Sequence, residues 1–236
     1  MTSLKLITFD LDNTLWPVAK VIERAEQASI RYLHQRFPEH ADQLTLQALA
    51  QLRQGMAQNR THYWKNLTQL RIDMLKLALS RLDLSHHDIN TAAQAAFDAF
   101  YEERNKVVFF QDVLGTLTTL KKHYTLGAIS NGNSDIHKVG LGDLFAFHLC
   151  AEKVGEAKPH PLIFNTALTL AGVAPAQSLH VGDHPQEDVD GARKAGMKTI
   201  WANQLDEHWP AELEKPQFEM TQFHQLTDLI GQCDDA

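Results

Sequence analysis

Two pairs of aspartates are the side chains of this chain that are best placed to do chemistry. Asp10 and Asp12 follow the apolar run 6–9, and Asp183 and Asp188 follow a second apolar run. Two carboxylates leaving one strand repel each other unless a cation is present, and Mg²⁺ prefers a few carboxylates with waters and substrate phosphate. The spacing therefore predicts a magnesium site, although the first pair alone is also typical of an ordinary turn or helix cap.

Two further segments offer groups that bind phosphate oxygens. Ser130 and Asn131 precede a glycine. A hydroxyl followed by main-chain N–H groups at a strand-to-helix turn can cradle phosphate, although an ordinary turn has the same composition. Lys158 could be a solvated surface charge, as most lysines are. Its neighbours Pro159 and Pro161 stiffen the segment, which favours a fixed position for the ammonium group.

Strand-like and helix-like segments alternate around these residues. The apolar runs 4–9, 126–129, 147–150, 179–181 and 199–202 predict strands, and the segments 113–123, 161–171, 188–195 and 222–232 predict helices. Apolar strands without polar alternation indicate a parallel sheet covered on both faces, hence an α/β, Rossmann-like core. Ligands bind such sheets at the carboxyl ends of the strands, where the polar segments lie.

A helical block interrupts this core directly after the first strand. Residues 17–105 hold one of the chain's twelve glycines, Gly55, and repeat apolar side chains at helical spacing. Pro38 and a turn at 84–87 mark breaks between helices. We expect an all-helical domain over residues 17–105, inserted into an α/β domain made of residues 1–16 and 106–236.

Composition excludes several classes of protein. The 236 residues, 44% hydrophobic and 22% charged, are ordinary for a globular chain and argue against collagen-like, disordered and disulfide-rich proteins. The net charge of −7 disfavours nucleic-acid and membrane-surface partners. We find no membrane span or signal segment and expect a cytoplasmic protein. Cys150 and Cys233 are expected to stay reduced.

Taken in order, the four polar segments resemble the motifs of the haloacid dehalogenase superfamily of aspartate-nucleophile hydrolases. They read Asp10-Leu11-Asp12-Asn13-Thr14, Ile129-Ser130-Asn131-Gly132, Lys158 before Pro159, and Gly182-Asp183 with Asp188. Each motif is weak alone, but four in this order cover essentially the whole chain. The resemblance implies that residues 17–105 form the four-helix cap of the family's first subclass.

The resemblance also implies a role for each residue of the phosphoryl transfer. Asp10 would be the nucleophile that forms an aspartyl-phosphate. Asp12 would protonate the leaving oxygen and then deprotonate the attacking water. Ser130, the Asn131 amide and Lys158 would hold the transferring oxygens.

A bound Mg²⁺ is implied in the same way. Asp10, the main-chain carbonyl of Asp12 and Asp183 would be its ligands, and Asp188 would orient Lys158 or a metal-bound water. The cation would screen Asp10 from the incoming phosphate and stabilise charge in the transition state.

The expected function is Mg²⁺-dependent hydrolysis of a small phosphorylated metabolite by a monomer or homodimer. The dehalogenases of the family lack the second aspartate of the first motif, so Asp12 favours phosphoryl chemistry. Gly182 differs from the acidic residue that the related sugar-phosphate mutases often carry, which favours hydrolysis. A phosphosugar mutase, a receiver-type phosphate switch and a non-catalytic phosphate-binding protein remain alternatives.

A narrower resemblance suggests a substrate. The Ser-Asn-Gly-Asn stretch at 130–133, the segment 140–145 and the long cap resemble bacterial phosphatases that act on flavin mononucleotide (FMN) and on 5-amino-6-(5-phospho-D-ribitylamino)uracil. In the helical block, a group of positive and aromatic side chains could recognise the leaving group, although amphipathic helices produce such clusters routinely. These residues are Arg53, Arg60, His62, Tyr63 and Trp64.

Overall fold

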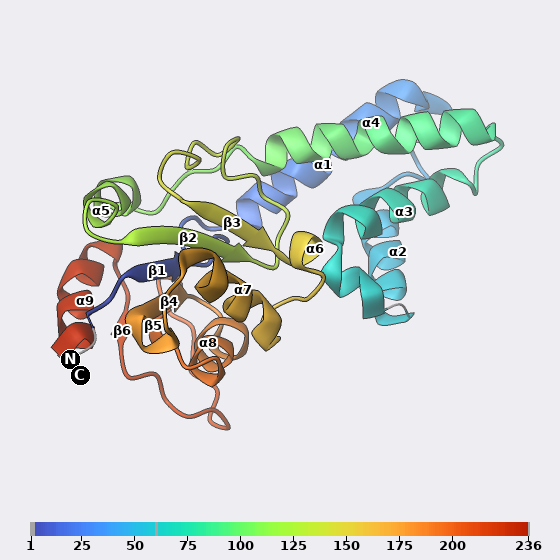
Figure 1. Cartoon of the computed structure of the whole chain (residues 1–236). Coiled ribbons are helices and arrows are strands. Elements are labelled where there is room, and N and C mark those ends of the chain that lie inside the picture. Colours follow the sequence, from blue (N-terminus) through green and yellow to red (C-terminus); the bar gives the residue numbers. More distant parts are fainter. Residues whose placement is uncertain (1–2, 60, 236) are drawn as a thin grey trace. The chain divides into compact units, whose positions relative to one another are not determined.

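The chain divides into two compact units, each described here by itself (Figure 1). The computed structural model describes residues 3–59 and 61–235. One unit consists of Met1–Pro17 with Val108–Ala236, and the other of Val18–Val107. The chain leaves the first unit and returns to it at adjacent points, because Phe110 N donates to Leu15 O at 2.9 Å.

Within the described residues, the first unit is built on a six-stranded parallel sheet. The strands are β1 (Leu6–Phe9), β2 (Thr125–Ser130), β3 (Phe147–Cys150), β4 (Ser178–Gly182), β5 (Lys198–Ala202) and β6 (Glu219–Met220), in the order β3-β2-β1-β4-β5-β6. The five predicted strands are all present. The sequence analysis missed β6, since two residues show no readable periodicity.

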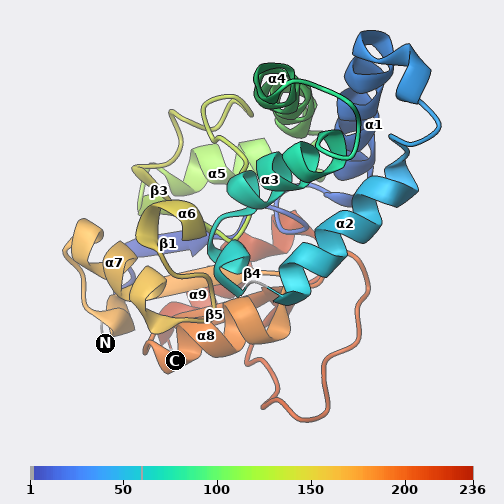
Figure 2. The same ribbon diagram turned by 90° about the vertical axis from the view of Figure 1, so that its right-hand side faces the viewer.

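Helices cover both faces of this sheet (Figures 1 and 2). They are α5 (Val113–Leu120), α6 (Ala151–Val154), α7 (Pro161–Ala171), α8 (Gly191–Lys194) and α9 (Leu226–Asp235), with short turns η3 (Pro175–Gln177), η4 (Pro185–Asp190) and η5 (Phe223–Gln225). Leu6 and Ile129 pack with Phe164 of α7 on one face. On the other face the ring of Phe9 meets those of Phe145 and Phe223, next to α5 and α9. Both faces of β1 are therefore buried, as its apolar sequence predicts.

The predicted helix 188–195 is wrong in its first half. Residues Pro185–Asp190 form a π-helical turn, η4, and only Gly191–Lys194 are α-helical. The turn is wide because Asp188 N and Val189 N both donate to His184 O, at 3.0 and 3.3 Å. Such turns are frequent at functional sites, and this one carries Asp188 to the end of β4.

The second unit is all helical. Its elements are α1 (Ala19–Arg36), η1 (Pro38–His40), α2 (Leu46–Asn59), η2 (Thr61–Lys65), α3 (Leu67–Leu79) and α4 (His86–Arg104). The predicted break at Pro38 is present, and Ser85 caps α4 by accepting from Asp88 N at 3.1 Å. The fold class is thus confirmed as a Rossmann-like parallel sheet with an inserted helical bundle.

One ion-pair cluster links all four helices of this unit. Glu26 of α1 accepts from Arg53 of α2 at 2.5 Å and lies 3.5 Å from Arg71 of α3. The Arg71 guanidinium lies over the Phe100 ring of α4, 3.6 Å from its centroid. Burial and the neighbouring Arg53 charge lower the pKa of Arg71 to about 10. The cluster therefore fixes the four helices against one another.

Two smaller expectations also concern the fold. Cys150 and Cys233 are buried and form no disulfide. Among the described residues, no helix is long and apolar enough to cross a bilayer.

The packing of α7 on the sheet can be tested with a matched pair of substitutions. Phe164 is fully buried, whereas Leu170 on the same helix is 59% exposed. Phe164→Ala is expected to lower the free energy of unfolding by about 3–5 kcal/mol because it leaves a cavity. Leu170→Ala is expected to change it by about 0.5 kcal/mol or less. Urea unfolding followed by circular dichroism measures both, and equal losses would contradict this packing.

Candidate active site

The register of the central strands brings the predicted residues to one edge of the sheet. Phe9 at the end of β1 pairs with Ala128 of β2 and Val181 of β4. Asp10 N then continues the ladder by donating to Val181 O at 2.9 Å. Successive strands are added on one side of β1 as far as β3 and on the other side from β4 onward. Asp10 therefore lies at the switch point where open α/β sheets bind ligands.

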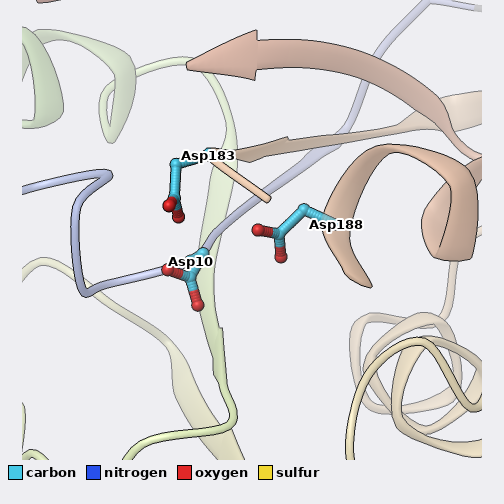
Figure 3. Close-up of side chains that lie close together, drawn as sticks. All are labelled: Asp10, Asp183 and Asp188. Carbon is cyan, nitrogen blue, oxygen red and sulfur yellow. The ribbon is translucent and has the colours of Figure 1, made fainter. Parts of the chain in front are cut away.

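Three carboxylates converge at this edge (Figure 3). Asp10, Asp183 and Asp188 each offer an oxygen atom, and these atoms all lie within 4.8 Å of one another. Asp10 and Asp188 are buried. Asp183 is further fixed by Thr14 Oγ1, which donates to its Oδ1 at 3.2 Å, and by Trp201 Nε1, which donates to its main-chain oxygen at 2.7 Å.

Lys158 lies between two of these carboxylates. Its buried Nζ donates to Asp10 Oδ1, to Asp188 Oδ1 at 2.6 Å and to Ile129 O at 3.0 Å, which uses its three protons. Burial alone would lower the pKa of Lys158, but the two carboxylates raise it above its usual value. Burial opposes ionisation of Asp188 too, but Lys158 and His180 hold its pKa far below the ordinary value.

The positive charge of Lys158 does not balance three carboxylates, and the pKa values of Asp10 and Asp183 are raised. Burial raises the pKa of Asp10 well above its ordinary value, with Lys158 opposing and Asp188 adding to the shift. Burial and then the Asp188 charge raise the pKa of Asp183 to about 7. A compact group of oxygen ligands with surplus negative charge fits a hard divalent cation such as Mg²⁺.

A histidine that the sequence analysis did not single out supports this cluster. His180 of β4 is buried, and its Nε2 lies 3.0 Å from Asp188 Oδ1 while its Nδ1 lies 2.8 Å from Thr8 Oγ1. Burial lowers the pKa of His180 and so favours the neutral ring. A neutral ring that donates from Nε2 to Asp188 and accepts at Nδ1 from the Thr8 hydroxyl satisfies all these groups. The sequence feature that could have identified this residue is a histidine between the apolar residues Leu179 and Val181 of a predicted strand.

Of the predicted phosphate-binding residues, Ser130 keeps a proton that it can donate, whereas the Asn131 side chain is used to hold Lys158. Ser130 Oγ is buried and accepts from Gly132 N at 2.9 Å, which leaves its own proton to donate. The Asn131 side chain instead braces Lys158, accepting from its N at 2.7 Å and donating to its O at 2.9 Å. The Asn131 amide also donates to a Glu187 carboxylate oxygen at 2.8 Å, so Glu187 helps to hold the side chain that binds Lys158.

The Asp12 carboxylate is not among the three converging carboxylates. Its Oδ1 accepts from the indole Nε1 of Trp16 at 2.9 Å. The structure therefore brings Asp10, Lys158, Asp183 and Asp188 together and gives the Asp12 carboxylate a separate partner.

The candidate recognition residues of the helical unit differ in their contacts and in their exposure. Arg53 is engaged by Glu26, and the buried Tyr63 donates to Asp73 Oδ2 at 2.8 Å. Trp64 is 61% exposed. Arg60 and the side chain of His62 lie outside what the structure describes.

Comparison with known proteins identifies the family. The pattern of the haloacid dehalogenase-like hydrolases matches residues 4–196. A 5-amino-6-(5-phospho-D-ribitylamino)uracil phosphatase, YigB, of Escherichia coli (strain K12) is 31% identical over 231 residues, 96% of each chain. A glyceraldehyde 3-phosphate phosphatase of Pyrococcus furiosus is 31% identical over 211 residues, 85% of this chain and 81% of its own.

A solved structure agrees with this assignment. A structure described as a 2-haloacid dehalogenase from Pseudomonas syringae pv. Tomato DC3000 superposes with a TM-score of 0.88 at 36% identity, covering 97% of this chain and 99% of that one. The chain belongs to the haloacid dehalogenase-like hydrolases, and the resemblance seen in the four motifs is confirmed.

The raised pKa of Asp183 predicts how stability depends on pH without metal. An unfolded aspartate loses its proton near pH 3.8, and folded Asp183 near pH 7. Between these values the unfolded chain binds fewer protons, so this group's stabilising contribution is complete below pH 3.8 and is lost as the pH rises through 7. An asparagine at position 183 does not titrate, so the Asp183→Asn variant does not lose stability in this way. The free energy of unfolding of Asp183→Asn minus that of the wild type is therefore expected to increase from pH 4 to pH 8.

Urea unfolding in EDTA at pH 4, 6 and 8 measures this difference. The exposed Asp143 provides a control, since Asp143→Asn is expected to follow the wild-type slope. A gain from Asp183→Asn that is constant with pH would contradict the shift.

Proposed function

We propose that this chain is a Mg²⁺-dependent phosphatase that hydrolyses a small phosphomonoester through an aspartyl-phosphate on Asp10. The observation that carries the proposal is the buried Asp10–Lys158 pair beside Asp183, at the carboxyl ends of β1 and β4. The broader prediction of a phosphoric monoester hydrolase is confirmed by the family and by its relatives, two of which are the phosphatases named above.

The first step is in-line attack on phosphorus. An Asp10 oxygen forms a bond to phosphorus while the bond to the leaving oxygen breaks, and Asp12 gives that oxygen a proton. Lys158, the Ser130 hydroxyl and the Asn131 main-chain N–H bind the transferring oxygens. Lys158 also favours the ionised form of Asp10 that the attack requires.

The second step releases phosphate. Asp12, now a carboxylate, takes a proton from a water as its oxygen bonds to phosphorus. The bond between phosphorus and Asp10 breaks, which regenerates the nucleophile. Covalent catalysis of this kind divides one difficult displacement into two easier ones.

Asp10, Asp183 and the main-chain carbonyl of Asp12 are the proposed ligands of Mg²⁺. When bound, the ion would neutralise charge between the nucleophile and the phosphate. Asp188 accepts from Lys158, from His180 and, at 2.9 Å, from His184 N. These bonds support a role for Asp188 in orienting Lys158.

The helical unit is proposed to be the cap that selects the substrate. The relative YigB acts, by its name, on 5-amino-6-(5-phospho-D-ribitylamino)uracil, which supports a riboflavin-pathway phosphate or FMN as the substrate of this chain. Among the side chains of the predicted recognition group that the structure describes, Tyr63 is buried and Trp64 is exposed, so Trp64 is the aromatic ring accessible to a ligand.

Dehalogenation is the second candidate, because the similar solved structure is described as a 2-haloacid dehalogenase. Carbon–halogen displacement has no use for an acid that protonates an alkoxide, whereas this chain carries Asp12. We therefore expect no chloride release from 2-chloropropionate above an enzyme-free blank. Chloride release in EDTA that Asp10→Asn abolishes would instead establish the dehalogenase.

The phosphatase is tested by phosphate release from p-nitrophenyl phosphate and a metabolite panel that includes FMN, with Mg²⁺ or EDTA. Asp10→Asn is expected to lower kcat by about 10³-fold or more because the nucleophile is lost. The exposed carboxylate variant Asp143→Asn should retain wild-type kcat. Turnover by Asp10→Asn at the wild-type rate would remove Asp10 as nucleophile, and phosphorylation without release would favour a mutase.

A further inference from the structure

A buried tryptophan binds the side chain that the proposed reaction uses for proton transfer. Trp16 is fully buried, and its Nε1 donates to Asp12 Oδ1 at 2.9 Å. The indole ring meets Phe109 edge-on, with 5.8 Å between the centroids. Packing therefore holds the ring, and the ring in turn holds the carboxyl group.

The main chain between the two residues fixes their separation. Asn13 N donates to Trp16 O at 2.7 Å, and Leu15 N donates to Leu11 O at 2.8 Å. Asp12 and Trp16 also form a β-bridge, and Asn13 turns the chain with a φ of 59°. The hydrogen bond thus joins two side chains of one closed loop, an arrangement that keeps a functional group in place.

An indole N–H can only donate, which gives the two oxygens of Asp12 different tasks. Oδ1 can accept from Trp16 whether the carboxyl group is ionised or protonated. A protonated oxygen is the poorer acceptor, so the transferable proton belongs on Oδ2.

We propose that Trp16 is a positioning residue for acid–base catalysis. By binding Oδ1 it directs Oδ2 of Asp12, which donates the proton to the leaving oxygen in the first step and accepts one from water in the second. The inference rests on the proposed role of Asp12, and it adds the residue that orients that side chain.

The test compares two leaving groups. A p-nitrophenolate leaves without a proton, whereas the alkoxide of glycerol 2-phosphate needs one. Trp16→Phe keeps an aromatic ring against Phe109 but removes the N–H. We expect kcat/KM for glycerol 2-phosphate to fall about tenfold or more, and that for p-nitrophenyl phosphate to change by about threefold or less.

Trp209 provides the matched control. Its Nε1 donates to Leu213 O at 3.2 Å, so Trp209→Phe removes a comparable hydrogen bond outside the Asp12 loop. The ratio of the two kcat/KM values should stay at the wild-type level. A purely structural role for Trp16 predicts equal losses on both substrates, and that result would overturn the proposal.

A double-mutant cycle separates this inference from the function on which it rests. Asp12→Asn should itself reduce kcat/KM more for glycerol 2-phosphate than for the nitrophenyl ester, and Trp16→Phe in that background should add no further discrimination. If Asp12→Asn does not discriminate, the acid–base role of Asp12 fails. If it does and Trp16→Phe does not, only the role of Trp16 fails.

A measurement on the wild-type fold covers the case in which Trp16→Phe does not fold. The Trp16 indole N–H resonance, assigned through its contacts with Phe109, should move upfield in Asp12→Ala, while the Trp209 resonance stays in place. An unmoved Trp16 resonance would show that the hydrogen bond is absent in solution and would overturn the proposal.

Discussion

The ammonium group of Lys158 is the interaction on which the rest of the site depends. Asp10 follows β1 and Asp188 lies in the η4 turn, and both are buried; the Lys158 ammonium favours the ionised form of each against that burial. Removing one partner from such a group leaves a buried charge uncompensated. The proposed nucleophile and the attachment of the η4 turn to the sheet therefore both depend on the Lys158 side chain.

The supporting residues explain how that side chain is held. Asn131 binds both main-chain polar groups of Lys158, and Glu187 binds Asn131 in turn. His180 Nε2 and His184 N both donate to Asp188 and complete its hydrogen bonding. These contacts use polar groups that would otherwise be buried without partners, and they restrict the site to one arrangement.

The features that could be predicted are those that a short stretch of sequence determines. The strand ends at Asp10 and Asp183 could be found because apolar runs stop there, and parallel strands place their ends together. His180 and Trp16 could not be assigned, because their partners are set by the η4 turn and by a closed loop that propensities do not describe. For the same reason the end of η4, residues 188–190, was predicted to be part of an α-helix.

The insertion of the helical unit after β1 has a consequence for how the chain folds. Leu6 pairs with Thr125 and Ser178, so both edges of β1 lack partners until those residues have been synthesised. The helical unit, by contrast, is one continuous segment with its own core and can form first. During synthesis a strand that is fully buried in the folded protein must wait until Ser178 has emerged, which makes β1 especially exposed to misassociation.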